Sequence, residues 1–264
     1  MLYIYGTVYN NSNRIEKSIE SLNKINMEKK FLIVDNYSND GSYEILCKLK
    51  EKFNITIKRE KSTRGKGRQI AMEMAYDEST DNDLFMMFDL DTIYLMDFLE
   101  LIEKYIKILK KNEIFLNFLC YKKTNFAIPW EDLNGAEDFQ RMAHSISEGY
   151  KLLLEKPEYD KYLFGNETTN YDDREKRYAG GIAYYKRRFY QVTDIMRSLG
   201  IRNVNNLKQY LKDVRVRKRF YPYSLFIFTI MKIKRRKIYS YDNDINLFYV
   251  RRNAEFIDLD FIRK

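Results

Sequence analysis

Two aspartates that directly follow an apolar run are the residues of this chain best suited to chemistry. The run Leu84–Phe88 leads into Asp89-Leu90-Asp91, and in extended chain the two carboxylates project to the same side. Such a pair repels itself unless a cation neutralises it, and Mg²⁺ or Mn²⁺ suits oxygen ligands. These ions take one or two carboxylates and complete their shell with substrate phosphates. The pair therefore predicts a site for a metal ion and a phosphate. The alternative is an acidic turn that is exposed to solvent and binds nothing.

Hydrophobic patterning indicates the elements that position this pair. A continuous apolar run suits a strand that is covered on both faces, as in a parallel α/β sheet. Strands that alternate with helices through right-handed crossovers give a Rossmann-like open sheet. Strands are expected at residues 2–9, 31–34, 55–58, 84–88 and 115–121. Helices are expected after Asn13, over 43–53, from about Arg68 to Tyr76, and over 98–109. Asn13 and Glu16 resemble a capping box at the start of the first helix.

The loops that follow successive strands gather at one edge of such a sheet, where ligands bind in open α/β folds. Asp35 can accept a hydrogen bond from a base or a ribose there. The basic, glycine-containing loop Lys61–Arg68 leads into a helix whose N-terminus can attract phosphate. By itself this loop is weak evidence, because its sequence is neither a Walker A motif nor GxGxxG. The combination is typical of a site for a nucleotide diphosphate.

Four segments in order carry a family resemblance: TVYNNSNRIEKSIESL, IVDNYSNDGS, RGKGRQIA and DLFMMFDLDT. Together they span about residues 1–95, and their order and spacing resemble glycosyltransferase family 2, which has the GT-A fold. The departures are small: Asn36 replaces a frequent second aspartate, and Thr7 stands where proline is common. The set is specific although no single member is.

This resemblance implies a UDP- or GDP-sugar donor and a divalent metal, Mn²⁺ or Mg²⁺. The resemblance implies that the nucleoside is contacted by Thr7, Tyr9 and Asp35. It implies that Arg64 and Arg68 lie near the base or the diphosphate. It also implies that Asp89 and Asp91 hold the metal-diphosphate.

The segment Trp130–Arg141 resembles the acceptor side of the same family, where an acidic pair opens a helix. By that match Asp138 is the general base that deprotonates the acceptor hydroxyl, and Glu137 supports it. Two acids in the first turn of a helix, favoured by its dipole, are the structural alternative. Asp132 is a second candidate for the base. Trp130 can stack on a sugar or pack in the core, and His144 is expected to be packed or solvated.

Composition and charge narrow the class of protein. The chain has 264 residues, two cysteines and one histidine, which excludes a disulfide framework and a Cys/His zinc site. The N-terminal segment lacks the basic region of a secretory signal, so a cytoplasmic setting is expected. The net charge is +9, but residues 186–264 carry 20 Lys and Arg against seven Asp and Glu, a balance of +13. This part therefore favours an anionic partner.

Two basic runs, Arg215–Arg219 and Lys232–Lys237, bracket the apolar stretch Phe220–Met231. Twelve residues are too few for a membrane-spanning helix, which needs about 20. The stretch is either an interfacial anchor on an anionic membrane or a segment packed on the catalytic domain. Further upstream, Tyr178–Ala183 is expected to form a strand whose backbone can approach a ligand closely, or merely a bend.

The sequence therefore predicts a GT-A catalytic domain at residues 1–185, with donor binding in 1–95 and the acceptor side in 96–185, and a basic, partly helical C-terminal extension at 186–264. The expected function is a metal-dependent, inverting glycosyltransferase with a glycan, lipid-phosphate or protein acceptor, cytoplasmic or peripheral at the inner face of the membrane. One alternative is a nucleotidyltransferase, but the segment TVYNNSN does not supply the triphosphate-binding loop that it needs. A second is a nucleic-acid-binding protein, for which no recognition motif is present. A third is a catalytically silent homologue.

Overall fold

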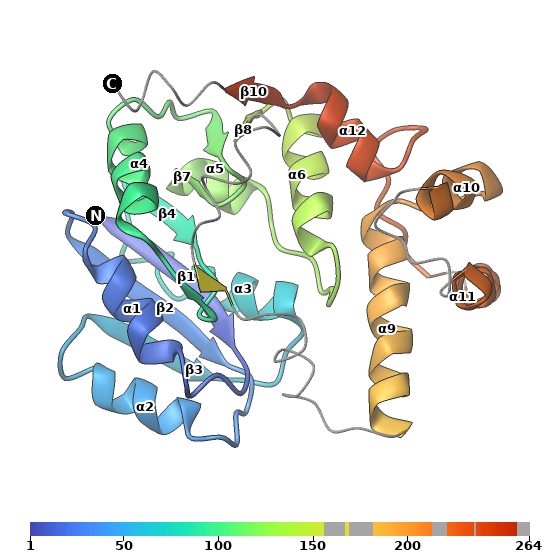
Figure 1. The fold of residues 1–264 in the computed structure, drawn as a ribbon. Coiled ribbons are helices and arrows are strands. Elements are labelled where there is room, and N and C mark those ends of the chain that lie inside the picture. The colour runs from blue at the N-terminus through green and yellow to red at the C-terminus, as the bar shows by residue number, and fades with distance from the viewer. Residues whose placement is uncertain (156–166, 169–181, 213–220, 235, 258–264) are drawn as a thin grey trace.

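The structure is a computed structural model that describes residues 1–155, 167–168, 182–212, 221–234 and 236–257. It contains a central sheet with helices on both faces (Figure 1). The strands are β1 (Leu2–Val8), β2 (Lys29–Asp35), β3 (Ile55–Arg59), β4 (Leu84–Met87), β5 (Thr92–Ile93), β6 (Glu113–Phe115), β7 (Leu119–Tyr121), β8 (Lys151–Glu155), β9 (Glu167–Thr168) and β10 (Glu255–Ile257). The helices are α1 (Ile15–Asn23), α2 (Ser42–Leu49), α3 (Arg64–Glu73), α4 (Met96–Ile106), α5 (Lys122–Ala127), α6 (Glu137–Ser147), α9 (Ile182–Ser198), α10 (Val204–Lys212), α11 (Tyr221–Ile233) and α12 (Asn246–Asn253).

The main sheet has the strand order β10-β8-β6-β7-β4-β1-β2-β3. Strands β4, β1, β2 and β3 are parallel, while β7 joins β4 antiparallel. The carboxyl ends of the parallel strands therefore meet at one edge, as the sequence predicts. This arrangement confirms the expected Rossmann-like open sheet.

The alternation of side chains along β1 shows why these strands are apolar throughout. Leu2 and Ile4 belong to the core that includes residues of α1, α2 and α4, whereas Tyr3 and Tyr5 face the core shared with α3. All four side chains are buried. A strand covered on both faces needs apolar residues at every position.

The stretch 115–121 is a hairpin and not the single strand that its apolar residues predict. Strands β6 and β7 pair antiparallel, with Phe115 opposite Leu119. Between them Leu116 (φ 50°) and Asn117 (φ 64°) adopt left-handed backbone, which reverses the chain. Leucine gives no sequence signal for such a turn, because glycine is the usual residue there.

Two other local predictions are wrong, and a third lies mostly outside the described residues. Asn13 does not cap α1, since the residue before that helix is Arg14 and no side chain caps it. Most of the expected basic loop 61–68 is helical, because Thr63 accepts a hydrogen bond from the amide of Lys66 and starts α3 at Arg64. Of the strand expected at 178–183, residues 178–181 lie outside the described part of the chain, and Ile182 and Ala183 begin α9.

The C-terminal helices α9, α10 and α11 lie beside the sheet, on the side of α6 (Figure 1). They share a core of their own, in which Met196, Leu207 and Ile227 are buried. Helix α12 packs directly on α6. Within the described residues, no helix combines the length and apolar composition needed to cross a bilayer.

Candidate active site

The N-terminus of α3 is held tightly against the segment that precedes α6. The amide of Gly65 donates to the carbonyl of Leu133 (3.0 Å), and the amide of Arg64 donates to the side chain of Asn134 (2.9 Å). A Cβ atom at Gly65 would lie 2.0 Å from the carbonyl oxygen of Glu131. The close approach of the two backbones therefore requires a glycine at this position.

Helix α6 begins with the acidic pair of the acceptor side. Ala136, with φ 52°, turns the chain into the helix at Glu137. Glu137 is fully buried, whereas the side chain of Asp138 is 39% exposed. Only Asp138 of the two can therefore meet a ligand from solvent.

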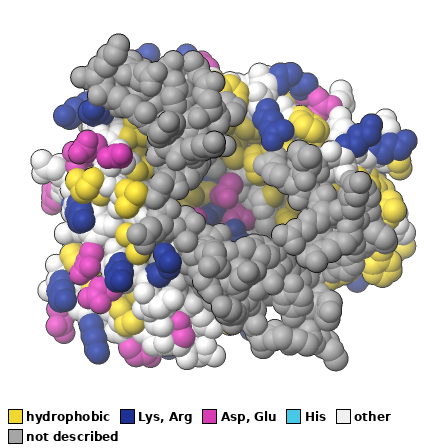
Figure 2. All heavy atoms as spheres, viewed as in Figure 1, with side chains coloured by type: hydrophobic (Ala, Val, Ile, Leu, Met, Phe, Trp, Pro, Cys, Tyr) yellow, Lys and Arg dark blue, Asp and Glu magenta, His cyan; other side chains and the backbone are white. Residues whose placement is uncertain are grey.

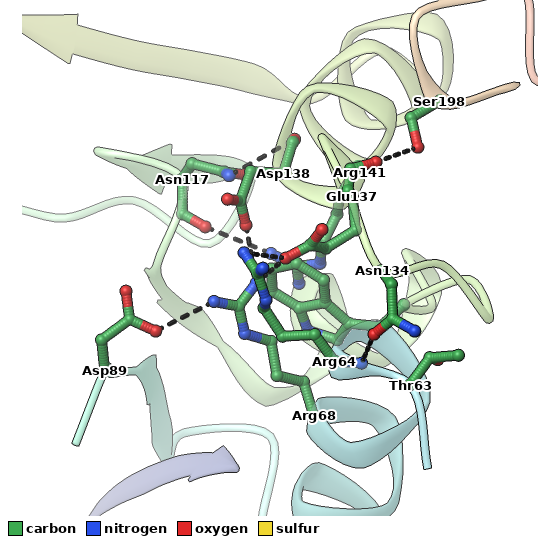
Figure 3. A network of polar contacts seen from close by, with 12 residues as sticks. Thr63, Arg64, Arg68, Asp89, Asn117, Asn134, Glu137, Asp138, Arg141 and Ser198 are labelled. Carbon is green, nitrogen blue, oxygen red and sulfur yellow. Dashed lines mark hydrogen bonds and ion pairs between the residues drawn. The ribbon is translucent and has the colours of Figure 1, made fainter. Parts of the chain in front are cut away.

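Arg68 joins the acidic pair to the first aspartate of the Asp89-Leu90-Asp91 motif (Figure 3). Its Nη1 contacts Glu137 Oε1 (3.0 Å) and Asp138 Oδ1 (2.8 Å), and its Nη2 contacts Asp89 Oδ1 (3.0 Å). Arg64 adds a second cation, with Nη1 at 3.2 Å from Glu137 Oε1. Residues that the sequence assigns separately to donor, metal and base thus form one network.

Buried side chains around Trp130 hold the guanidinium of Arg68 in place. Its guanidinium carbon lies 4.8 Å from the centre of the Trp130 ring, and that of Arg141 lies 4.7 Å from the same ring. Trp130 Nε1 donates to the Tyr5 hydroxyl (3.0 Å), and Arg141 Nη2 donates to Asn125 Oδ1 (2.7 Å). Trp130 is 3% exposed, so of the two roles considered for it the structure shows the core role.

The charges in this network shift each other's pKa values. Burial raises the pKa of Glu137, against the opposing effect of Arg64 and Arg68. Burial alone would lower the pKa of Arg68, but the carboxylates of Asp138, Asp89 and Glu137 outweigh it and raise that pKa. Arg64 and Arg68 both have a raised pKa, so both stay charged at any physiological pH.

The sequence predicts that Asp89-Leu90-Asp91 is extended, but the structure shows a turn there. Strand β4 ends at Met87, and the amide of Thr92 bonds back to the carbonyl of Asp89 (3.2 Å), so Leu90 and Asp91 lie in a turn. The Tyr94 hydroxyl accepts from the Asp89 amide (3.0 Å). Burial raises the pKa of Tyr94, and the Asp89 carboxylate adds to this, so the hydroxyl remains protonated.

The donor set at this turn fits a metal that is shared with a diphosphate. The Asp89 side chain is 54% exposed and Asp91 is half-buried, so both can be reached from solvent. Among the described residues, no group of three or more His, Cys, Asp or Glu side chains could hold a metal ion alone. A hard divalent cation here would need further oxygen ligands from phosphate and water.

The residues expected at the nucleoside lie at the neighbouring strand ends. The Thr7 hydroxyl donates to the carbonyl of Val34 (3.1 Å), and Tyr9 follows β1. Asp35 is fully buried, and its carboxylate contacts Arg59 Nε (3.1 Å) and the Ser38 amide (3.2 Å). Asp35 therefore organises its loop and anchors Arg59.

Two further acceptor-side predictions are placed by the structure. Asp132, the second candidate for the base, accepts from the Thr63 hydroxyl (2.6 Å). His144, which is expected to be packed or solvated, stacks on Tyr241 and lies 3.6 Å from Glu148.

Sequence reasoning missed several residues around the network. Asn117 has a left-handed backbone, its Nδ2 lies 3.5 Å from the carbonyl of Asp138, and its buried Oδ1 has no hydrogen-bond partner among the described residues. Asn134 ties α3 to α9, since its amide donates to Asp194 (3.0 Å). An asparagine in a predicted strand or loop carries no signal for either contact.

Charged side chains are visible at the centre of the face that holds this network. In the space-filling view, acidic and basic side chains lie next to one another there (Figure 2). A charged surface of this kind suits a polar, phosphorylated ligand.

Similarity to known proteins agrees with this geometry. Residues 4–191 match the model of glycosyl transferase family 2. A search of curated proteins found no match.

Two solved structures of TarS, with TM-scores of 0.51 and 0.50, share the fold at low sequence identity. S. aureus TarS 1-349 in complex with UDP has a TM-score of 0.51 and 14% identity, over 86% of this chain and 80% of that one. The UDP-GlcNAc complex of TarS gives a TM-score of 0.50 and 13% identity, over 86% and 79%. The mannosyltransferase PcManGT from Pyrobaculum calidifontis, in complex with GDP-Man and Mn²⁺, gives 0.49 and 11%, over 95% and 72%. The sheet, the network at its edge and the match over most of the chain show that the protein belongs to glycosyl transferase family 2 and has the GT-A fold.

Proposed function

We propose that this nucleotide-sugar glycosyltransferase is metal-dependent and inverting, and that it transfers a sugar from a UDP- or GDP-sugar to an acceptor hydroxyl or phosphate. The observation that carries the proposal is Arg68, which contacts Asp89 of the metal motif and Asp138 of the acidic pair at 3.0 and 2.8 Å. A contact of one side chain with both carboxylates supports a single site in which the donor side adjoins the acceptor side.

Asp89 and Asp91 are the residues that would hold the metal ion. Such an ion, when bound, supplies positive charge for the departing nucleotide diphosphate. Arg68 and Arg64 lie beside the same carboxylates, so they add fixed positive charge where the leaving group becomes more negative.

Asp138 is the residue that would take the proton of the acceptor hydroxyl. Its carboxylate is partly exposed, and Arg68 holds one of its oxygens in a fixed position. Glu137 is buried and can only support this arrangement. A base on the acceptor side, across from the leaving group, is what direct displacement with inversion requires.

Binding of nucleotides tests the donor site. Calorimetry with UDP and GDP, each with and without Mn²⁺, is expected to show metal-dependent binding of one of them, because the carboxylate pair needs a cation to tolerate a diphosphate. The variant Asp91→Ala is expected to lose this metal-dependent binding. Asp97 is an exposed aspartate outside the motif, and the variant Asp97→Ala is expected to bind the nucleotide as the wild type does. Failure of both nucleotides to bind the folded wild type would refute the donor site.

We also propose that the C-terminal region docks on an anionic membrane surface. Helix α11 buries Ile227 and Met231, yet it exposes Phe226 (58%) and Ile233 (75%). No acidic residue lies between Tyr221 and Lys237, and basic residues follow the helix. One face therefore packs, and the other carries the apolar side chains and positive charge of an interfacial helix.

Vesicle sedimentation tests this docking. The double variant Leu225→Ser with Phe226→Ser is expected to bind vesicles containing phosphatidylserine about tenfold or more weakly, because two large apolar side chains no longer insert. Met96→Ser, a change at a similarly exposed apolar residue of α4, is the control and should bind like the wild type. Equal binding of wild type to purely zwitterionic vesicles, or no effect of the double variant, would contradict the proposal.

A further inference from the structure

Asn11 is buried where the loop that follows β1 meets the Asp89-Leu90-Asp91 turn. Its side chain is 2% exposed, and its Nδ2 donates a hydrogen bond to the carbonyl of Leu90. The two residues are 79 positions apart in the sequence, so this contact joins two separate loops at the edge of the sheet. Since solvent does not reach Asn11, the residue acts on a ligand through the groups that it holds.

The backbone of Asn11 also joins the loops that follow β1 and β2. Its amide donates to Oγ of Ser42, the first residue of α2 (2.8 Å). One residue earlier, the amide of Asn10 donates to Ser38 Oγ (2.9 Å). Tyr9, which is expected at the nucleoside, directly precedes this pair in the chain. Asn11 therefore belongs to the loops on which the nucleoside is expected to bind.

Two side chains hold the backbone of the Asp89-Leu90-Asp91 turn. The hydroxyl of Tyr94, from the segment that directly follows the turn, accepts from the amide of Asp89 (3.0 Å). Asn11 holds the carbonyl of Leu90 from the side of the nucleoside loops. The backbone at Leu90 sets the directions of the Asp89 and Asp91 side chains. A displaced Leu90 carbonyl would therefore move both carboxylates away from the geometry that a shared metal ion needs.

We propose that Asn11 is a positioning residue that couples the binding of the nucleotide to the binding of the metal ion. This inference rests on the proposed function, in which Asp89 and Asp91 hold the metal ion. A nucleoside on the loop that follows β1 orders Asn11, and Asn11 then fixes the Leu90 carbonyl between the two carboxylates. A metal ion that shares a diphosphate is coupled to the nucleotide in any case, and the contribution of Asn11 adds to this coupling.

The size of this contribution follows from two general rules. Coupling between two sites is reciprocal, so the metal ion raises the affinity for the nucleotide by the same factor by which the nucleotide raises the affinity for the metal ion. Loss of a side chain that orients metal ligands costs about ten- to a hundredfold in metal affinity. A loss of this size in the coupling factor is therefore expected when the donor of Asn11 is removed.

Calorimetry measures the coupling factor as the ratio of the dissociation constants of UDP or GDP in EDTA and at saturating Mn²⁺. The variant Asn11→Leu keeps the size of the side chain but removes the donor. It is expected to lower the factor about tenfold or more, while the dissociation constant in EDTA changes by less than about threefold. The variant Asn11→Ala removes the same donor without adding an apolar group and should show the same loss, so the result does not depend on the folding of one variant.

Two control variants separate coupling from a general loss of binding. Asn13 is an exposed asparagine of the same loop, and Asn13→Leu should keep the wild-type coupling factor. Tyr94→Phe keeps the ring but removes the hydroxyl that contacts the Asp89 amide. It should raise the Mn²⁺ concentration needed for half-saturation and leave the coupling factor unchanged. A merely structural role of Asn11 would weaken nucleotide binding in EDTA and in Mn²⁺ by the same factor.

The outcomes distinguish the inference from the function on which it rests. If Mn²⁺ strengthens nucleotide binding by the same factor in the wild type and in both Asn11 variants, the coupling role of Asn11 is refuted and the donor site stands. An equal loss of the factor in Asn13→Leu would also refute this role. If Mn²⁺ strengthens the binding of neither UDP nor GDP to the folded wild type, the metal-dependent function and the inference both fail.

Discussion

Replacement of Arg68 by methionine is expected to abolish turnover and to lower the free energy of unfolding by about 3 kcal/mol. Arg68 is 1% exposed and contacts three carboxylates, of which Glu137 is fully buried. Removal of one partner leaves a buried charge uncompensated, and this costs more than the pair itself contributes. The effect stays at the low end of the usual range because Arg64 still contacts Glu137, and Asp89 and Asp138 reach solvent.

The loss of stability should depend on pH in a defined direction. Burial already raises the pKa of Glu137, and without Arg68 this pKa rises further, above the value of about 4.3 in an unfolded chain. A carboxyl whose folded pKa is raised contributes its full stability below the unfolded pKa and loses it as pH rises through the folded pKa. The deficit of Arg68→Met relative to wild type should therefore be smaller at pH 5 than at pH 8.

Urea denaturation at the two pH values, followed by circular dichroism, measures both effects. The matched control is Arg64→Met, since Arg64 contacts the same Glu137 oxygen but its side chain is 44% exposed. Its loss should be about 1 kcal/mol or less, as for partly solvated ion pairs. An equal loss in the two variants, or a deficit that does not change with pH, would show that Arg68 does not neutralise a buried carboxylate.

The parallel sheet could be predicted because its strands are buried on both faces and therefore have unbroken apolar runs. The runs at Ile4, Ile33 and Phe85 meet this condition, and all three residues are buried. The hairpin at Leu116 and Asn117 could not be predicted, since its turn depends on left-handed residues that are not glycine. Tertiary packing selected that conformation against the local preference.

Some residues of the candidate site could likewise be predicted from the sequence, and others could not. Asp89, Asp138 and the arginines of α3 could be singled out because the segments that carry them resemble those of the family, and the fold brings them together through Arg68. The position of Arg59 beside the carboxylate of Asp35 could not be predicted, because a lone arginine at a strand end has many uses. Its partner Asp35 is 24 residues away in sequence and adjacent only through the register of β2 and β3.

Replacement of Asp138 by asparagine is expected to reduce kcat by a factor of about 10² to 10⁴ while the binding of UDP or GDP is retained. Asparagine keeps an oxygen that accepts from Arg68 Nη1, so the network survives, but it cannot take a proton at pH 7. The measurement is the release of UDP or GDP from the sugar nucleotide with water as the acceptor, together with calorimetric binding of the same nucleotide.

Two matched variants assign the base. Asp132→Asn alters the second candidate, whose carboxylate accepts from the Thr63 hydroxyl, and should change kcat by less than about threefold because its contact serves the start of α3. Glu137→Gln alters the buried neighbour and should affect stability more than it affects the proton transfer. If Asp132→Asn abolishes turnover while Asp138→Asn retains it, the base is Asp132, and Asp138 serves to hold Arg68 in place. Since Arg68 contacts Asp138 but not Asp132, only a base at Asp138 would link deprotonation of the acceptor to the same arginine that contacts the metal motif.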